Sequence, residues 1–370
     1  MSKSVRKHKP FAGFVALMMV LTLSFLAGFT KSDASISNSD LSDQMQSQVN
    51  DLLKQEMVAR HWKLVDSTIT LQSIENSDSK VSAIFDIHAT HLLDYSSPED
   101  VPIMKGKLQY VADNKISGQS LNSINKDIAM WKSDLQTYIT TPLPYNNLIK
   151  AEGSIDSNGK LSKESVAFYV MNEAREWIPY TLSNITTPDE AEKNGYDGLK
   201  AQVQELQTKS QNDNIAPTAV VPFIYDRLEA RDYGYSSNTT KVCKSGSSTT
   251  QDASHYNSQY TYYNCNDCAN YVSQCLYTGG IPTDSTWCPG SLSWIQANTL
   301  ISYMLNKGYI YSATANTCVA GYPMKVHGKE HVELMVYNDG QSRLANAHTN
   351  DKYWVPYYDT MDYYQVPQVA

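Results

Sequence analysis

The sequence predicts an α+β protein built from two different parts. Helical and alternating patterns are interspersed up to about residue 215, whereas beyond it the helical patterns come first and the strands come last. All six cysteines and most of the 26 tyrosines lie beyond residue 218. The polar segment at residues 209–222, with its two prolines, has the composition of a linker. We therefore expect an N-terminal α+β domain over residues 35–215 and, over residues 216–370, a C-terminal domain with helices packed on an antiparallel sheet.

The first 34 residues are set apart from both domains. A basic head precedes the uncharged apolar run of residues 11–29, and Ser32-Asp33-Ala34 places small residues where a signal peptidase reads. This layout predicts a secretory signal peptide cleaved near Ala34, and hence a secreted, extracellular or cell-wall-associated protein. The alternative is a membrane anchor through residues 11–29, because that run is just long enough to span a bilayer. Association with the cell surface is compatible with both.

The charge of the chain limits its partners. The formal net charge is -8, and loss of the basic leader makes the remainder more acidic. Affinity for phosphate backbones comes from clustered Lys and Arg, and the sequence has no basic cluster with interleaved aromatic residues. We expect no nucleic-acid partner. The sequence leaves the oligomeric state open.

The N-terminal part shows patterns for both element types but no chemistry. Helical spacing is seen in two sets, Leu41, Met45, Val49, Leu52 and Leu53, and then Ile124, Ile128, Trp131, Leu135 and Ile139. Alternation over residues 81–89 predicts a half-buried strand, and SVAFYVM from Ser165 predicts another. His88 and His91 are interpreted as surface residues of the first strand rather than as metal ligands. A binding or spacing role is expected for this part.

In the C-terminal part the predicted helices precede the predicted strands. A helix is expected over FIYDRLEARDYGY from Phe223, a second from Cys268 to the Gly279-Gly280 stop, and a third over residues 291–308 with Gly308 as its C-cap. The runs HVELMVY and SRLANAHT flank Asn338-Asp339-Gly340, and Asp-Gly between alternating runs is a hairpin signal.

Cys268 is a candidate nucleophile because of its place at a predicted helix start. Asp267 is a good N-cap residue, so the thiol would meet the partial positive charge and the unpaired N–H groups of the first turn, which favour thiolate and can hold an oxyanion. Three other interpretations compete. Cys268 could be a core residue, a redox partner of Cys265, or a zinc ligand with Cys265, Cys275 and Cys288, although those spacings match no common knuckle.

The remaining cysteines are expected to be structural. Disulfides are favoured in a secreted chain, so Cys243, Cys265, Cys288 and Cys318 could pair in three ways. Cys275 would then be a buried thiol on the inner side of the helix.

A cysteine nucleophile needs a base, and the base needs a third group to orient it. His331 opens a predicted strand and is the candidate base. Across the predicted hairpin, Asn346 and His348 share a face with Leu344. A Cys at a helix start, a His at a strand start and a polar residue on the next strand is the arrangement of papain-like hydrolases. His327 and His331 could also be read as a zinc pair, but that spacing needs a helix, so no metal or cofactor is expected.

With these residues in hand, the C-terminal part resembles the bacterial putative amidase domain, a cysteine-hydrolase family related in plan to the NlpC/P60 and CHAP domains. The resemblance runs from about Pro222 to Tyr358, and NDCANYVSQCLYTGG is its most specific part. It implies a papain-like fold, Cys268 as nucleophile, His331 as base and His348 as the orienting residue, with Asn346 as the alternative. Asp267 would cap the helix next to the oxyanion region.

Two features depart from the family pattern. Glu333 stands where an apolar residue is usual, two positions after the histidine, and its charge would raise the imidazole pKa. The extra cysteines suggest a disulfide-braced variant. The resulting expectation is a secreted cysteine amidase or peptidase that acts on a peptide or peptidoglycan-like substrate. The alternative is a non-catalytic cell-surface binding protein that retains the fold.

Overall fold

The computed structural model describes residues 38–77, 79–114, 116, 118–211, 223–236, 256–264, 266–349 and 351–367. All of these residues belong to one compact unit, Ile36–Ala370. The predicted signal peptide and most of the predicted linker lie outside the described residues. Within the described residues, no helix has the length and apolarity needed to cross a membrane.

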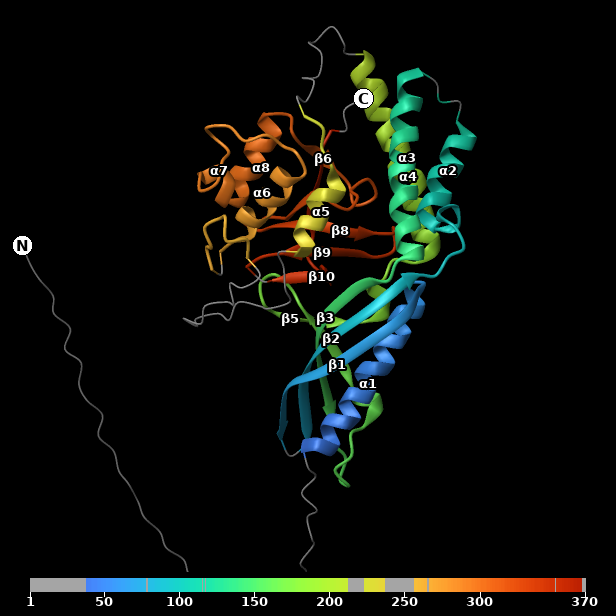
Figure 1. The fold of residues 1–370 in the computed structure, drawn as a ribbon. Coiled ribbons are helices and arrows are strands. Elements are labelled where there is room, and N and C mark those ends of the chain that lie inside the picture. Colours follow the sequence, from blue (N-terminus) through green and yellow to red (C-terminus); the bar gives the residue numbers. More distant parts are fainter. Residues whose placement is uncertain are drawn as a thin grey trace, which may run out of the picture. The chain divides into compact units, whose positions relative to one another are not determined.

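The N-terminal part is built on an antiparallel five-stranded sheet in the order β1-β2-β3-β4-β5. Its strands are β1 (Trp62–Ser77), β2 (Lys80–Leu93), β3 (Leu143–Ser154), β4 (Ala167–Met171) and β5 (Trp177–Tyr180). Helix α1 (Asn38–Ala59) lies along this sheet (Figure 1) and buries the apolar set predicted from its spacing. The alternation over residues 81–89 also holds, because the odd-numbered positions of β2 are buried.

His91 differs from its predicted place on the surface. It is fully buried, and its ring stacks on Trp62 with centroids 3.8 Å apart, whereas His88 is exposed as expected. The reason lies in the strand period of two: position 91 continues the inward odd-numbered series of β2. Burial, helped by the charge of Arg60, lowers the pKa of His91 to about 3, so the ring is neutral.

Three helices extend the N-terminal part beyond its sheet. They are α2 (Pro102–Asp113), α3 (Gly118–Thr140) and α4 (Pro188–Gln211), and short 3-10 turns occur at η1 (Pro98–Asp100), η2 (Lys163–Ser165) and η3 (Leu182–Asn184). Helix α3 contains the second predicted helical set. Helices α2 and α4 cross closely at glycines: a Cβ on Gly106 would lie 1.8 Å from the carbonyl oxygen of Glu192, and one on Gly195 would lie 2.0 Å from that of Ile103.

The C-terminal part places helices before an antiparallel sheet, as predicted. The helices are α5 (Arg227–Ser236), α6 (Cys268–Thr278), α7 (Leu292–Ile295) and α8 (Ala297–Asn306). The six strands run in the order β10-β9-β8-β7-β11-β6. They are β6 (Tyr311–Ala313), β7 (Pro323–Val326), β8 (Val332–Asn338), β9 (Arg343–Ala347), β10 (Lys352–Pro356) and β11 (Met361–Gln365). The single helix predicted over residues 291–308 is divided, because Gln296 has extended backbone angles.

The predicted hairpin forms between β8 and β9, but its register contains a bulge. Tyr337 pairs with Leu344, whereas Met335 pairs with Ala345 and Leu334 with Asn346, so Val336 is the extra residue. A bulge of this kind shifts the register by one and exchanges the faces of the residues beyond it. The side chains that follow on β9 are therefore turned over relative to a regular hairpin.

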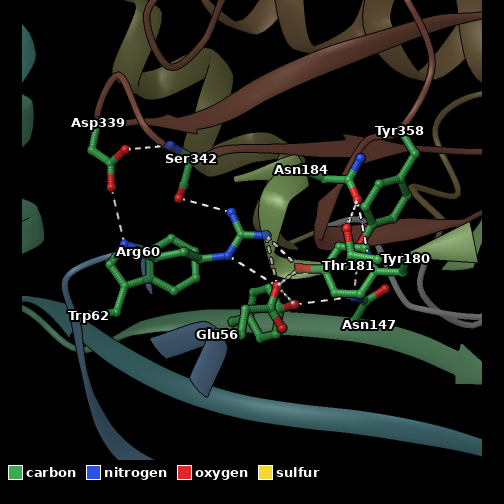
Figure 2. A network of polar contacts seen from close by, with 11 residues as sticks. Glu56, Arg60, Trp62, Asn147, Tyr180, Thr181, Asn184, Asp339, Ser342 and Tyr358 are labelled. Carbon is green, nitrogen blue, oxygen red and sulfur yellow. Dashed lines mark hydrogen bonds and ion pairs between the residues drawn. The ribbon is translucent and has the colours of Figure 1, made fainter. Parts of the chain in front are cut away.

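A buried polar network joins α1 and the first sheet to the turn between β8 and β9 (Figure 2). The Glu56 carboxylate accepts hydrogen bonds from Arg60, Tyr145 and Tyr180, and the Arg60 guanidinium also donates to Ser342 Oγ at 2.9 Å. Trp62 Nε1 donates to Asp339 Oδ2 at 3.1 Å. The two parts of the chain thus share buried hydrogen bonds as well as apolar contacts.

The four cysteines that the structure describes form no disulfide, so the predicted pairing of Cys288 and Cys318 is not seen. Cys268, Cys275, Cys288 and Cys318 are free thiols, while Cys243 and Cys265 lie outside the described residues. Cys318 is fully buried, with Sγ 3.8 Å from the carbonyl oxygen of Tyr364, so it serves the core as a small apolar side chain. The expectation of a buried thiol at Cys275 is confirmed.

Candidate active site

Cys268 is the first residue of α6 and is 6% exposed. The imidazole of His331 and the backbone N–H groups of Ala269 and Val332 lie close enough to the thiol to lower its pKa. The sulfur also lies 4.0 Å from the carbonyl oxygen of Glu330. The structure therefore brings the two principal sequence-predicted residues, Cys268 and His331, into contact.

His331 stands directly before β8, and its ring is held from both sides. Its Nε2 lies 3.3 Å from Glu173 Oε2 and 3.4 Å from Glu333 Oε1. Both contacts are ion pairs, and Nε2 makes no regular hydrogen bond to either carboxylate. With Nε2 turned to the carboxylates, Nδ1 is the ring nitrogen available to the thiol.

These contacts shift the pKa values of both groups. Burial alone would raise the pKa of the Cys268 thiol, but the hydrogen bond and charge of His331 outweigh it and leave that pKa lowered. Burial alone would lower the pKa of His331, but its interactions with Cys268 and Glu333 and the charges of Cys268 and Glu173 raise that pKa to about 10. The arrangement favours a thiolate beside an imidazolium, the reactive form of a cysteine nucleophile.

A cluster of buried charges supports the imidazole. Lys352 Nζ lies 2.7 Å from Glu333 Oε1 and also contacts Glu173 Oε1. Burial would raise the pKa of Glu333, but Lys352 and His331 hold it below its usual range. The strand register explains why Lys352 and Glu333 lie together. Lys352 of β10 pairs with Ala347 of β9. The neighbouring residue, Asn346, pairs with Leu334 of β8, which is next to Glu333.

Sequence reasoning missed two members of this cluster. Glu333 stood out as a departure from a family pattern, but Glu173 and Lys352 did not stand out. The alternation in DKYWVP places Lys352 on one face of a strand, yet only the sheet order shows which residues share that face. Glu173 lies in the connection between β4 and β5, more than 150 residues from His331 in the sequence, and no local pattern points to it.

His348 and Asn346 lie elsewhere. The bulge at Val336 puts Asn346 opposite Leu334, on the face away from Glu333. Asn346 Nδ2 donates to the carbonyl oxygen of Gly234, and its Oδ1 accepts from the Trp354 N–H. His348 is buried with Nδ1 2.8 Å from Asp267 Oδ2 and is not among the partners of His331.

In this position His348 and the adjacent Thr349 both bond to Asp267. Asp267 occupies the N-cap position of α6, but its side chain makes no capping hydrogen bond. Its carboxylate instead receives His348 Nδ1 and Asn270 Nδ2, and its N–H donates to Thr349 Oγ1 at 3.0 Å. Thr349 has φ +92°, a costly value for a β-branched residue. Residues 348 and 349 thus hold Asp267, the residue that precedes Cys268.

The same cluster bears on metal binding. Among the described residues, one group of three potential ligands lies close enough for a metal ion: Glu173, His331 and Glu333, with ligand atoms within 4.8 Å of one another. Lys352 already places an ammonium on both carboxylates. The two negative charges are balanced by Lys352 and a protonated His331, so the donor set fits an imidazolium without a metal.

The fold and the site define an α+β protein with a buried Cys–His pair at the start of a helix. Residues 224–368 match the model of a family described as "Putative amidase domain", which supports a hydrolase of the amidase type for this region. A segment of 110 residues is 30% identical to "Uncharacterized protein YjcM" of Bacillus subtilis (strain 168), and it covers 28% of this chain and 27% of that protein. No solved structure matches the chain. Glu173 lies outside the matched region.

Proposed function

We propose that the protein is a cysteine-dependent amide hydrolase with Cys268 as nucleophile and His331 as base. The observation that carries the proposal is the placement of His331 beside the Cys268 thiol at the N-terminus of α6. It is supported by the match of residues 224–368 to an amidase domain.

The proposed reaction is acyl transfer. The Cys268 thiolate attacks the amide carbonyl, and the N–H groups at the helix start stabilise the developing oxyanion. His331 gives its proton to the departing amine, and the thioester that remains is hydrolysed by water, from which His331 takes a proton. In this scheme Glu333 keeps the imidazole protonated until the amine leaves.

The substrate and location are part of the same proposal. The apolar run of residues 11–29 and the small residues before Ser35 support export, so a peptide amide outside the cell, such as one in cell-wall peptide, is the proposed substrate. Sequencing the N-terminus of protein recovered from the medium tests export. A chain beginning near residue 35 is expected, and a chain that retains residues 11–29 in the membrane fraction contradicts it.

Thiol labelling tests the nucleophile. Iodoacetamide should alkylate Cys268 at a pH well below the ordinary thiol range, before Cys288, which is a free and partly exposed thiol in the same chain. Cys268→Ala should abolish both the fast labelling and amide hydrolysis, while Cys288→Ser serves as the matched control and should change neither.

The pH dependence of hydrolysis and of alkylation distinguishes the role of His331 as proton donor from the role of Cys268 as nucleophile. Above the His331 pKa of about 10, the imidazole loses the proton that the leaving amine needs, but the sulfur stays ionised. Amide hydrolysis should therefore fall above that pH while alkylation stays fast. Full hydrolysis by Cys268→Ala would refute the proposed mechanism. Absence of turnover of any peptide amide by the wild-type protein would favour a binding role.

A further inference from the structure

Glu173 reaches the site from a part of the chain that does not match the amidase domain. It lies in the tight turn between β4 and β5, where the Arg175 N–H donates to the carbonyl oxygen of Asn172 at 2.9 Å. The turn is fixed to the C-terminal part, because the Glu173 N–H donates to Asp359 Oδ2 at 2.8 Å and Lys329 Nζ lies 3.0 Å from Asp359 Oδ1. The carboxylate of Glu173 is therefore delivered to His331 by an anchored hairpin.

We propose that Glu173 is a positioning residue of the Cys268–His331 pair, so that the N-terminal part supplies a component of the active site. This inference rests on the proposed function and adds to it a residue from outside the matched region. It gives the N-terminal part a role in the chemistry itself, beyond binding or spacing.

The charges around His331 show why one carboxylate is not enough. The groups that face the ring are Cys268 from α6, Glu333 from β8 and Glu173 from the β4–β5 turn. Lys352 from β10 lies behind both carboxylates. If Glu173 were neutral, Glu333 would be the only carboxylate among these groups to pair with both the Lys352 ammonium and the His331 imidazolium. Lys352 is the closer of the two, at 2.7 Å against 3.4 Å, so the imidazolium would lose more.

The geometry also argues for control of ring orientation. Nε2 is held between two oxygens at 3.3 and 3.4 Å that come from different elements. Two acceptors fix the direction of the N–H more closely than one, and this direction sets where the opposite nitrogen meets the thiol. Removal of Glu173 should leave the ring free to turn toward Glu333.

The test is a titration of His331 followed by NMR of histidine-labelled full-length protein, with the resonance assigned by its loss in His331→Gln. Glu173→Gln keeps the shape of the side chain but removes its charge, and it should lower the His331 midpoint by about 1–3 pH units. Glu176→Gln is the matched control, because Glu176 lies in the same turn, is exposed and bonds to Asn172. The control should titrate like the wild type.

Two more variants test whether the charge and the anchoring of Glu173 set the His331 midpoint. Glu173→Asp retains the charge and should recover part of the shift. Asp359→Asn weakens the anchor of the β4–β5 turn but leaves the side chains of Glu173, Glu333 and Lys352 unchanged, and it should shift the midpoint in the same direction by less. An unchanged midpoint in folded Glu173→Gln protein would overturn the inference even if amides are hydrolysed. A shifted midpoint without any amide hydrolysis would support it while contradicting the proposed function.

Discussion

At the scale of single residues, the free cysteines show what decides the state of a thiol in this protein. Burial raises the pKa of Cys275 and of Cys318, and no cation offsets it enough. Cys268 is buried as well, yet its pKa is lowered because His331 supplies both a hydrogen bond and a positive charge. The environment built around the thiol makes the difference, since the residue type and the depth of burial are similar.

His348 offers a residue-scale prediction that separates two roles. It stacks on Tyr271 with ring centroids 4.2 Å apart and bonds to Asp267, so His348→Asn should leave a buried carboxylate oxygen poorly paired and cost about 1–3 kcal/mol of unfolding free energy. The His331 titration midpoint should not move. Denaturant unfolding and the NMR titration measure the two effects. A moved midpoint would restore His348 as the residue that orients His331.

Cys268 and His331, which lie together in the candidate site, carry local signals in the sequence. Cys268 was identified from an N-cap residue and a helix stop, and His331 from its place at a strand start. The third group could not be predicted, since it depends on register. A regular hairpin continued from the Tyr337–Leu344 pair would set His348 opposite Glu333, and the bulge at Val336 turns it to the other face. Nothing in the run HVELMVY marks that bulge.

At the scale of elements, α2 and α4 depend on glycines for their close approach. Gly195 faces the Ile103 carbonyl oxygen, whereas a Cβ on Gly198 of the same helix would lie 3.1 Å from Asn316 Cβ and at least 3.7 Å from the Asn316 backbone. Of the helices α2, α3 and α4, the sequence pattern predicts only α3. The apolar spacing of α3 predicted that helix, but α2 and α4 bury their close contacts through backbone, which leaves little hydrophobic periodicity to detect.

The two glycines make a matched pair for mutation. Alanine is the better helix former by about 1 kcal/mol, so Gly198→Ala should be close to neutral or mildly stabilising. Gly195→Ala forces the helices apart and should cost about 1–3 kcal/mol. Thermal and denaturant unfolding would measure both. Equal stability of the two variants would show that the crossing is looser than the 2.0 Å approach implies.

At the scale of the whole molecule, buried ion pairs connect segments that are far apart in the chain. Arg227 of α5 makes two hydrogen bonds of 2.8 Å to the Asp134 carboxylate of α3. Arg60 connects Glu56 to Ser342 in the same way (Figure 2). The predicted boundary near residue 215 divides the two sheets, but the Arg227–Asp134 ion pair and the Arg60–Ser342 hydrogen bond cross it. Sequence patterns cannot show contacts of that range.

The Glu56–Arg60 pair allows a test with an internal control. Arg60→Met leaves a buried carboxylate without its cation and should cost about 3–5 kcal/mol. Lys193 and Asp197 form a pair with the same spacing, but Lys193 is 76% exposed, so Lys193→Met should change stability by about 0.5 kcal/mol or less. Denaturant unfolding measures both. A loss of stability in Arg60→Met as small as that in Lys193→Met would mean that the buried network does not support the fold.

The hydrogen bond from Trp62 to Asp339 and the one from Arg60 to Ser342 have a consequence for recombination. A chimaera made by exchanging residues 224–368 for the corresponding region of a different protein that matches the same domain would keep the chain continuous and both sheets complete. It would still fail to dock unless the incoming turn between β8 and β9 carried an acceptor for Trp62 and an acceptor for Arg60. The two parts are therefore expected to be inherited together, as a matched set.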